Sequence, residues 1–238
     1  MKNNIVYIFD NLGFSYAINL LNKKLVWAKN HKIPFRSNVK ISNDKIIIAD
    51  QNNSLHFLNK FNGKRLKIIP TEETILKNQY INSLSSDKNT LFFLNTYGSL
   101  YSISQNDLKI NWFSNFNQSL DMNPGNLFFS NPIILHDKTL VISTDPFLYI
   151  VNSTNGSIIY KLPVTSIVKP IISGKYIFLI TKDNLLVCID LISGKINYSI
   201  DISIEIANYL NSKNKTIQIK SMSILNSNLY IFLNNSYV

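Results

Sequence analysis

Short apolar runs separated by polar turns recur along this chain. The runs are rich in β-branched and aromatic residues, with little helix-capping chemistry nearby, so each predicts a β-strand. Runs that end on a polar residue are GFSYAIN ending at Asn19, NSLHFLN at Asn59, GSLYSIS at Ser104, PFLYIVN at Asn152 and NLLVCID at Asp190. A second predicted strand precedes each of them, at 4–10, 45–51, 90–96, 139–145 and 175–181. The pattern therefore predicts antiparallel β-structure made of repeated strand pairs.

The polar residue that ends each of these runs is the anchor of one sequence repeat. Successive anchors are 40, 45, 48 and 38 residues apart, and the copies align without gaps beyond them. The fourth residue after the anchor is Lys23, Gly63, Leu108, Gly156 or Gly194, and the eighth is Trp27, Lys67, Trp112, Tyr160 or Tyr198. A period near 40 is typical of propellers and solenoids, and short strands at this period predict four-stranded antiparallel blades.

Each copy has the chemistry of a hairpin. An Asn or Asp anchor can bond its own backbone and start a turn, and a glycine four residues later tolerates the positive φ that closes a short loop. The aromatic at the eighth position lies on the return strand, with room to pack against the neighbouring repeat. The nearest helical candidate, 73–84, is interpreted as an inter-blade loop. The longer repeats place inserted loops at 68–88 and 113–132.

The repeat pattern (strand, Asp or Asn, three residues, Gly-Lys, two residues, Trp) resembles the PQQ-like propeller family. The Trp-Asp dipeptide of WD repeats and the Gly-Gly pair of kelch repeats do not occur. The resemblance implies an all-β, PQQ-like propeller of about five blades plus partial edge blades. We expect one domain over 1–238, incomplete at both ends because a sixth copy at 224–238 stops before its anchor. In that family the eighth-position Trp packs between blades, which implies a blade-docking role for Trp27, Trp112, Tyr160 and Tyr198, whereas Lys67 departs from the pattern.

Composition changes this picture little. The 238 residues are 45% hydrophobic, which is globular, and no apolar run reaches the length of a membrane span. The formal net charge is +10, but the lysines are scattered singly and the only arginines are Arg36 and Arg65. That distribution favours an AT-rich codon bias over nucleic-acid binding, so no nucleic-acid partner is predicted. Binding of other anions by the basic surface remains an alternative.

The residues that could carry chemistry do not form a site in the sequence. Cys188 stands alone, in a repeat position otherwise filled mainly by apolar or small residues, so it is predicted to be core. His31, His56 and His136 lack metal-ligand spacing, no carboxylate pair suggests acid–base work, and no Gly-Lys pair has a P-loop pattern. We therefore predict no catalytic residue, no metal and no cofactor.

Within the PQQ-like family, the chain resembles the BamB-type lipoproteins that assist outer-membrane assembly. The resemblance implies a non-enzymatic scaffold for protein–protein interaction, periplasmic and outer-membrane associated, whose partner is the outer-membrane β-barrel assembly machinery. The compartment is implied by resemblance alone, because MKNNIVYIFDNLG does not have the pattern of a signal peptide. Two alternatives stay open: a relative of the PQQ-dependent quinoprotein dehydrogenases, and a cytoplasmic interaction module.

Binding residues of propellers belong on loops. The inserted segment FSNFNQSLDMNPGN, at 113–126, combines turn formers with the apolar residues Phe113, Phe116, Leu120 and Met122. These four are the candidate partner-binding residues. The alternative is that the segment packs against the edge of its own blade.

Overall fold

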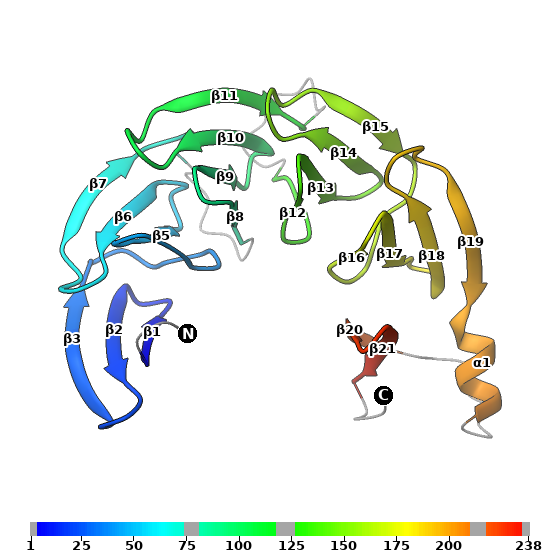
Figure 1. Cartoon of the computed structure of the whole chain (residues 1–238), viewed down its shortest axis with the longest axis horizontal. Coiled ribbons are helices and arrows are strands. Elements are labelled where there is room, and N and C mark those ends of the chain that lie inside the picture. Colours follow the sequence, from blue (N-terminus) through cyan, green and yellow to red (C-terminus); the bar gives the residue numbers. More distant parts are fainter. Residues whose placement is uncertain (1–3, 74–80, 118–126, 210–217, 235–238) are drawn as a thin grey trace. The chain divides into compact units, whose positions relative to one another are not determined.

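The computed structural model describes residues 4–73, 81–117, 127–209 and 218–234, and these form six antiparallel sheets (Figure 1). Two compact units contain them, Met1–Phe129 and Ser130–Val238. In every sheet the hydrogen-bonded neighbours follow chain order, as the repeated hairpins predict.

The first unit contains three sheets. The strands are β1 (Ile5–Phe9), β2 (Phe14–Asn19) and β3 (Lys24–Asn30); β4 (Lys40–Ser42), β5 (Lys45–Ala49), β6 (Leu55–Asn59) and β7 (Arg65–Ile69); and β8 (Ser83–Ser86), β9 (Thr90–Leu94), β10 (Ser99–Ser104) and β11 (Ile110–Asn115). The last two sheets are complete four-stranded blades. β8 begins inside the segment interpreted as an inter-blade loop, of which residues 74–80 lie outside the described residues.

The second unit also contains three sheets and adds one helix. Its elements are β12 (Ile134–His136), β13 (Thr139–Ser143), β14 (Leu148–Asn152) and β15 (Ile158–Leu162); β16 (Ile171–Ser173), β17 (Tyr176–Ile180), β18 (Leu185–Asp190) and β19 (Ile196–Asp201); α1 (Ile202–Tyr209); and β20 (Ile219–Leu225) and β21 (Asn228–Leu233). The sequence pattern did not predict α1. Ile202 anchors the helix by packing with Val168 and Ile180.

Apolar cores lie between neighbouring sheets. Alternate side chains of a strand face opposite sides of its sheet. In β5, Ile46 and Ile48 accordingly face a core shared with the first sheet, whereas Ile47 and Ala49 face a core shared with the third. A central strand with both faces buried has a continuous apolar sequence, which is why KIIIA has no polar alternation.

A β-bulge recurs at the same repeat position in both units. The pairing of the outermost strand with the strand before it shifts register at Ala17/Ile18, Phe57/Leu58, Ser102/Ile103, Ile150/Val151 and Cys188/Ile189, always the two residues before the anchor. A bulge inserts an extra residue and changes the direction of the side chains beside it. Here the bulge directly precedes the eighth-position residue of the outer strand.

The eighth-position side chain of one blade reaches the anchor turn of the next. In the first unit, the buried Trp27 donates its indole N–H to the Lys60 carbonyl at 3.0 Å. Gly63, at φ 67°, faces the ring, and a Cβ there would lie 2.7 Å from ring carbons. In the second unit, the Tyr160 hydroxyl donates to the Ile192 carbonyl at 2.7 Å, and Gly194 faces its ring in the same way.

Lys67 makes the same kind of contact without a ring. Its ammonium group donates to the Leu108 carbonyl at 3.1 Å, in the anchor turn of the third sheet. Leu108 occupies the position that is glycine opposite Trp27 and Tyr160, has φ 57°, and packs on the core between the second and third sheets. The lysine side chain is narrower than an aromatic ring and therefore leaves room for a leucine in the facing turn. An aromatic ring at the same position requires glycine there.

Exchanging this pair tests the correspondence. Lys67→Trp alone should destabilise the protein by about 1–3 kcal/mol, because the ring would overlap the Leu108 side chain. Combining it with Leu108→Gly should recover most of that loss. Urea unfolding of the wild type, both single variants and the double variant measures the coupling, and strictly additive changes would contradict the pairing.

Candidate functional site

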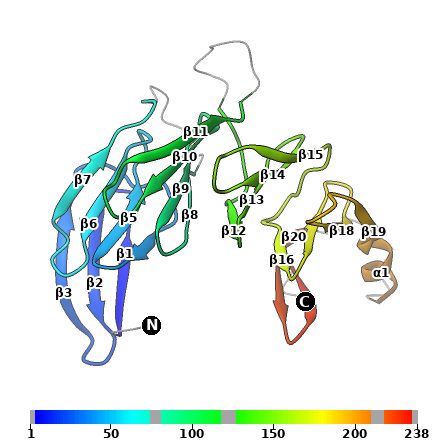
Figure 2. The same ribbon diagram turned by 45° about the horizontal axis from the view of Figure 1, so that its top comes forward.

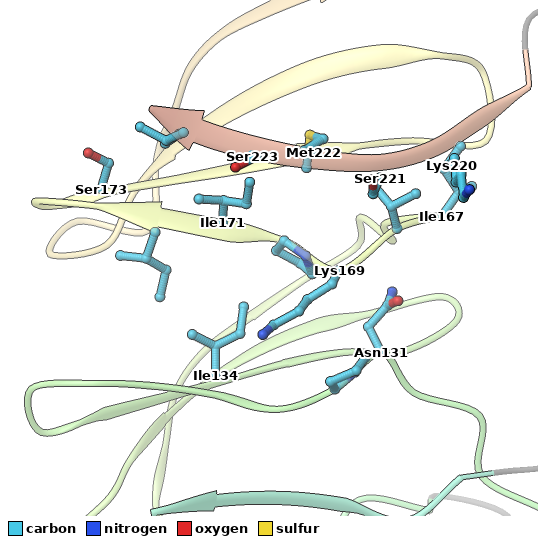
Figure 3. A pocket seen from close by; sticks show the side chains of 15 residues that line it. Asn131, Ile134, Ile167, Lys169, Ile171, Ser173, Lys220, Ser221, Met222 and Ser223 are labelled. Atoms are coloured by element: carbon cyan, nitrogen blue, oxygen red, sulfur yellow. The ribbon is translucent and has the colours of Figure 1, made fainter. Parts of the chain in front are cut away.

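The second unit contains a groove of about 810 Å³ bordered by the innermost strands of its sheets, β12, β16 and β20 (Figure 3). Its lining is about half apolar, from Ile134, Ile167, Ile171, Met222 and Ile224. Asn131, Lys169, Lys220 and serines of β16 and β20 supply the polar half. A hollow that combines apolar and polar groups can bind an organic ligand or a peptide.

Two lysines give the groove its charge. Lys169 lies between the buried residues Val168 and Pro170 in the connection that precedes β16, and its side chain extends into the groove (Figure 3). Lys220 lies on β20. No carboxylate among the described residues lines the groove, so its field is positive. It is suited to a ligand that is both anionic and apolar.

The connection holding Lys169 is fixed by buried hydrogen bonds around Ser166. The Ser166 hydroxyl donates to the Val168 carbonyl at 2.6 Å, the Ser166 carbonyl accepts from the Asn131 side chain at 2.7 Å, and the Ile167 N–H donates to the Ile180 carbonyl at 2.8 Å. The repeat pattern did not point to Lys169 or Lys220. The only local signal was Lys-Pro, which favours an extended connection but says nothing about a groove.

An anionic aromatic dye probes the groove directly. Anilinonaphthalene sulfonate should bind saturably, and Lys169→Glu/Lys220→Glu should weaken that binding about tenfold, because two attractive charges become repulsive. The matched control is Lys138→Glu/Lys195→Glu, two exposed lysines of the same unit that do not line the groove. Equal weakening in both variants would contradict a groove-specific interaction. Fluorescence titration supplies the measurement.

The predicted partner-binding residues have different surroundings. Phe113 on β11 is 51% exposed, whereas Phe116, just beyond the strand, is 3% exposed. The Phe116 N–H donates to the Gly98 carbonyl at 2.8 Å, which ties the start of the inserted segment to the third sheet. Leu120 and Met122 lie outside the described residues. Of the four candidates, only Phe113 is therefore placed on an exposed surface.

The other two predicted blade-docking residues lie on outer strands. Trp112 on β11 is half-buried, and its ring lies 6.0 Å from that of Phe92, centroid to centroid. Tyr198 on β19 is exposed and stands opposite Cys188 in the strand pairing. Cys188 is buried.

A buried histidine–aspartate contact in the first unit has no signature in the sequence. His56 Nε2 lies 2.7 Å from Asp50 Oδ2, and both residues are buried. The other carboxylate oxygen of Asp50 accepts the backbone N–H groups of Asn52 and Ser54 at 2.8 and 2.9 Å. Asp50 therefore closes the β5–β6 turn and fixes His56 in the sheet, a structural arrangement for both groups.

Glu72 forms a second polar cluster, on the connection from the second sheet to the third. Its carboxylate accepts from the Ser99 hydroxyl at 2.6 Å, and from the Tyr101 hydroxyl and the Asn95 amide at 2.7 Å. Burial raises the pKa of Glu72, but these hydrogen bonds more than offset it, so the pKa is below its usual value. Burial and then Glu72 itself raise the pKa of Tyr101. The cluster holds the connection against the β9–β10 hairpin.

His31 is the described histidine with a strongly shifted pKa. Its Nε2 lies 2.9 Å from the Ser15 hydroxyl, and its ring packs edge-on against Phe35. Burial, followed by the positive charges of Arg65, His56 and Lys29, lowers the pKa of His31 to about 4. The fold therefore favours the neutral imidazole.

This shift predicts a pH dependence of stability. Because the folded-state pKa of His31 lies below the unfolded value of 6.5, its contribution is fully present above pH 6.5 and is lost as the pH falls towards about 4. The difference in unfolding free energy between the wild type and His31→Gln should therefore shrink over that window. Urea unfolding at a series of pH values measures it, and parallel profiles would contradict the assignment.

Across the described ranges, no group of three or more His, Cys, Asp or Glu side chains is placed to hold a metal ion. No helix in those ranges is long and apolar enough to cross a membrane.

Chain-ordered antiparallel blades, cores between neighbouring blades and repeated turn contacts define a PQQ-like β-propeller. A family model described as "Outer membrane protein assembly factor BamB" matches residues 2–199, and the chain belongs to this family. The all-β propeller fold predicted from the repeats is thereby confirmed. Comparison with curated protein sequences found no match.

Two solved structures share the fold. BamB from Moraxella catarrhalis is 12% identical, with a TM-score of 0.75 over 98% of this chain and 68% of that chain. The computationally designed Ika8 protein is 11% identical, with a TM-score of 0.70 over 97% of this chain and 65% of that chain. At such identities the likeness concerns the fold alone. The chain spans about two thirds of the length of these two structures.

Proposed function

We propose that this chain is a non-enzymatic scaffold that binds protein partners and has a BamB-like role in the assembly of outer-membrane β-barrel proteins. The observation that carries the proposal is the family match over residues 2–199. The proposal that the chain is not an enzyme is supported by the contacts of Asp50, His56 and Glu72. These titratable side chains close turns and join sheets. The same family membership supports a periplasmic location at the outer membrane.

The partner in this proposal is the outer-membrane β-barrel assembly machinery. The segment 113–126 is its contact, and Phe113 is the described residue through which the contact is made. Phe113 is large, apolar and exposed, and its ring lies 5.0 Å from that of Tyr101, which holds it against the sheet. An aromatic side chain whose position is fixed by its neighbours loses little conformational entropy on binding, which suits it to anchor an interface. Phe116 instead secures the start of the segment from within.

Substituting Phe113 tests the proposal. Phe113→Asp should reduce co-purification of the assembly machinery by about tenfold or more, the cost of losing one aromatic anchor from an interface. Ile110→Asp is the matched control, because Ile110 lies on the same strand and is 49% exposed. The urea midpoint of both variants should stay within the range of surface substitutions. Undiminished co-purification of Phe113→Asp would refute the contact, and failure of the wild type to co-purify would refute the function.

A further inference from the structure

Two neighbouring hairpins of the first unit present apolar tips surrounded by lysines. We call two segments the turn edge: 20–24, which is the β2–β3 turn with the first residue of β3, and 60–64, between β6 and β7. Leu21 is 76% exposed and Phe61 58% exposed, although both are large apolar residues. Their backbone N–H groups donate to the anchors Asn19 and Asn59 at 2.9 Å, so each follows its anchor by the same two residues and projects in the same way.

The two tips belong to one continuous surface. The Trp27 N–H bonds the Lys60 carbonyl, and Gly63 packs on the Trp27 ring, so the second hairpin rests directly on the outer strand that follows the first. The Lys60 N–H also donates to the Asp44 carbonyl in the β4–β5 turn, which places that turn at the same end of the sheet. Figure 2 shows the β2–β3 and β6–β7 hairpins towards the same end of their sheets.

The charge at this end is positive. Lys23, Lys24 and Lys64 are exposed, and none of the described carboxylates pairs with them. Lys60 pairs with Asp44 at 2.9 Å, and its ammonium group also lies 4.9 Å from the centre of the Phe61 ring. The opposite end of the same sheets has mixed charge, where Asp10, Asp50 and Glu72 stand beside Lys32 and Arg36. In the first two sheets, lysines therefore outnumber the one carboxylate, Asp44, at the end that holds the turn edge, whereas the other end holds both signs of charge.

This combination fits a lipid surface better than a protein. Lysine is depleted from the cores of protein interfaces, and such interfaces need a contiguous patch, whereas the tips here are single residues separated by lysines. At an anionic bilayer, lysines interact with the headgroups while leucine and phenylalanine enter the boundary with the acyl chains. We propose that the turn edge docks on an anionic bilayer surface, with Leu21 and Phe61 inserted and Lys23, Lys24 and Lys64 against the headgroups.

Vesicle flotation of the full chain tests this. The chain should float with vesicles of phosphatidylglycerol and phosphatidylcholine but not with phosphatidylcholine alone, and high salt should weaken the binding because it screens the lysines. Leu21→Asn/Phe61→Asn should bind the mixed vesicles about tenfold more weakly, since two inserted apolar groups are lost. The matched control, Leu12→Asn/Ile81→Asn, changes residues that are 69% and 67% exposed at the opposite end and should bind as the wild type does.

Substituting lysines tests the contribution of charge to vesicle binding separately from that of apolar insertion. Lys23→Gln/Lys24→Gln should weaken flotation. Lys23→Gln alone should also weaken it, whereas Lys32→Gln, which removes an exposed lysine at the opposite end, should not. Heparin retention should fall with Lys23→Gln/Lys24→Gln but not with Leu21→Asn/Phe61→Asn. The proposal is overturned by absence of wild-type flotation, by equal losses in the control variants, or by full binding of Leu21→Asn/Phe61→Asn. Co-purification of the assembly machinery should not change in this last variant, so the two proposals fail independently.

Discussion

Each described junction between complete repeats contains the same kind of hydrogen bond, from the side chain eight residues after one anchor to a turn carbonyl of the next blade. Trp27, Lys67 and Tyr160 supply an indole, an ammonium and a phenol for it. What these groups share is a donor at the end of a long side chain, not aromaticity. The bond satisfies a carbonyl that no strand pairs with, and it does so where the core between two sheets meets solvent.

The recurrent bulge explains how this position of the outer strand makes the contact. By adding one residue just before the eighth position, the bulge turns that side chain across the sheet towards the neighbouring blade. The glycine of the receiving turn then admits the ring, and its positive φ costs little. The bulge and the glycine act together. The bulge directs the ring towards the next blade, and the glycine leaves room for the ring there.

The sequence predicted the strands, the turns and the glycines because each has a local signature. It did not predict the bulge, which changes register without a characteristic residue, nor α1, whose ISIEIANY is rich in the β-branched residues typical of strands. The burial of Phe116 and the Asp50–His56 pair depend on contacts between strands, which a linear pattern does not contain. The groove was not predicted for a further reason. Two of the strands that border it, β12 and β16, have three residues each, and such short strands show no recognisable periodicity in the sequence.

The pairing of Lys67 with Leu108 has a consequence for how such a chain can change. The two partners of this junction are 41 residues apart and belong to different blades, so the second sheet contains both the acceptor for the first sheet, at Lys60, and the donor for the third, Lys67. Deleting the second sheet would place the Trp27 ring against Leu108, and deleting the third would place Lys67 over a glycine. The repeats look interchangeable along the sequence, but this junction gives the second and third repeats a fixed order.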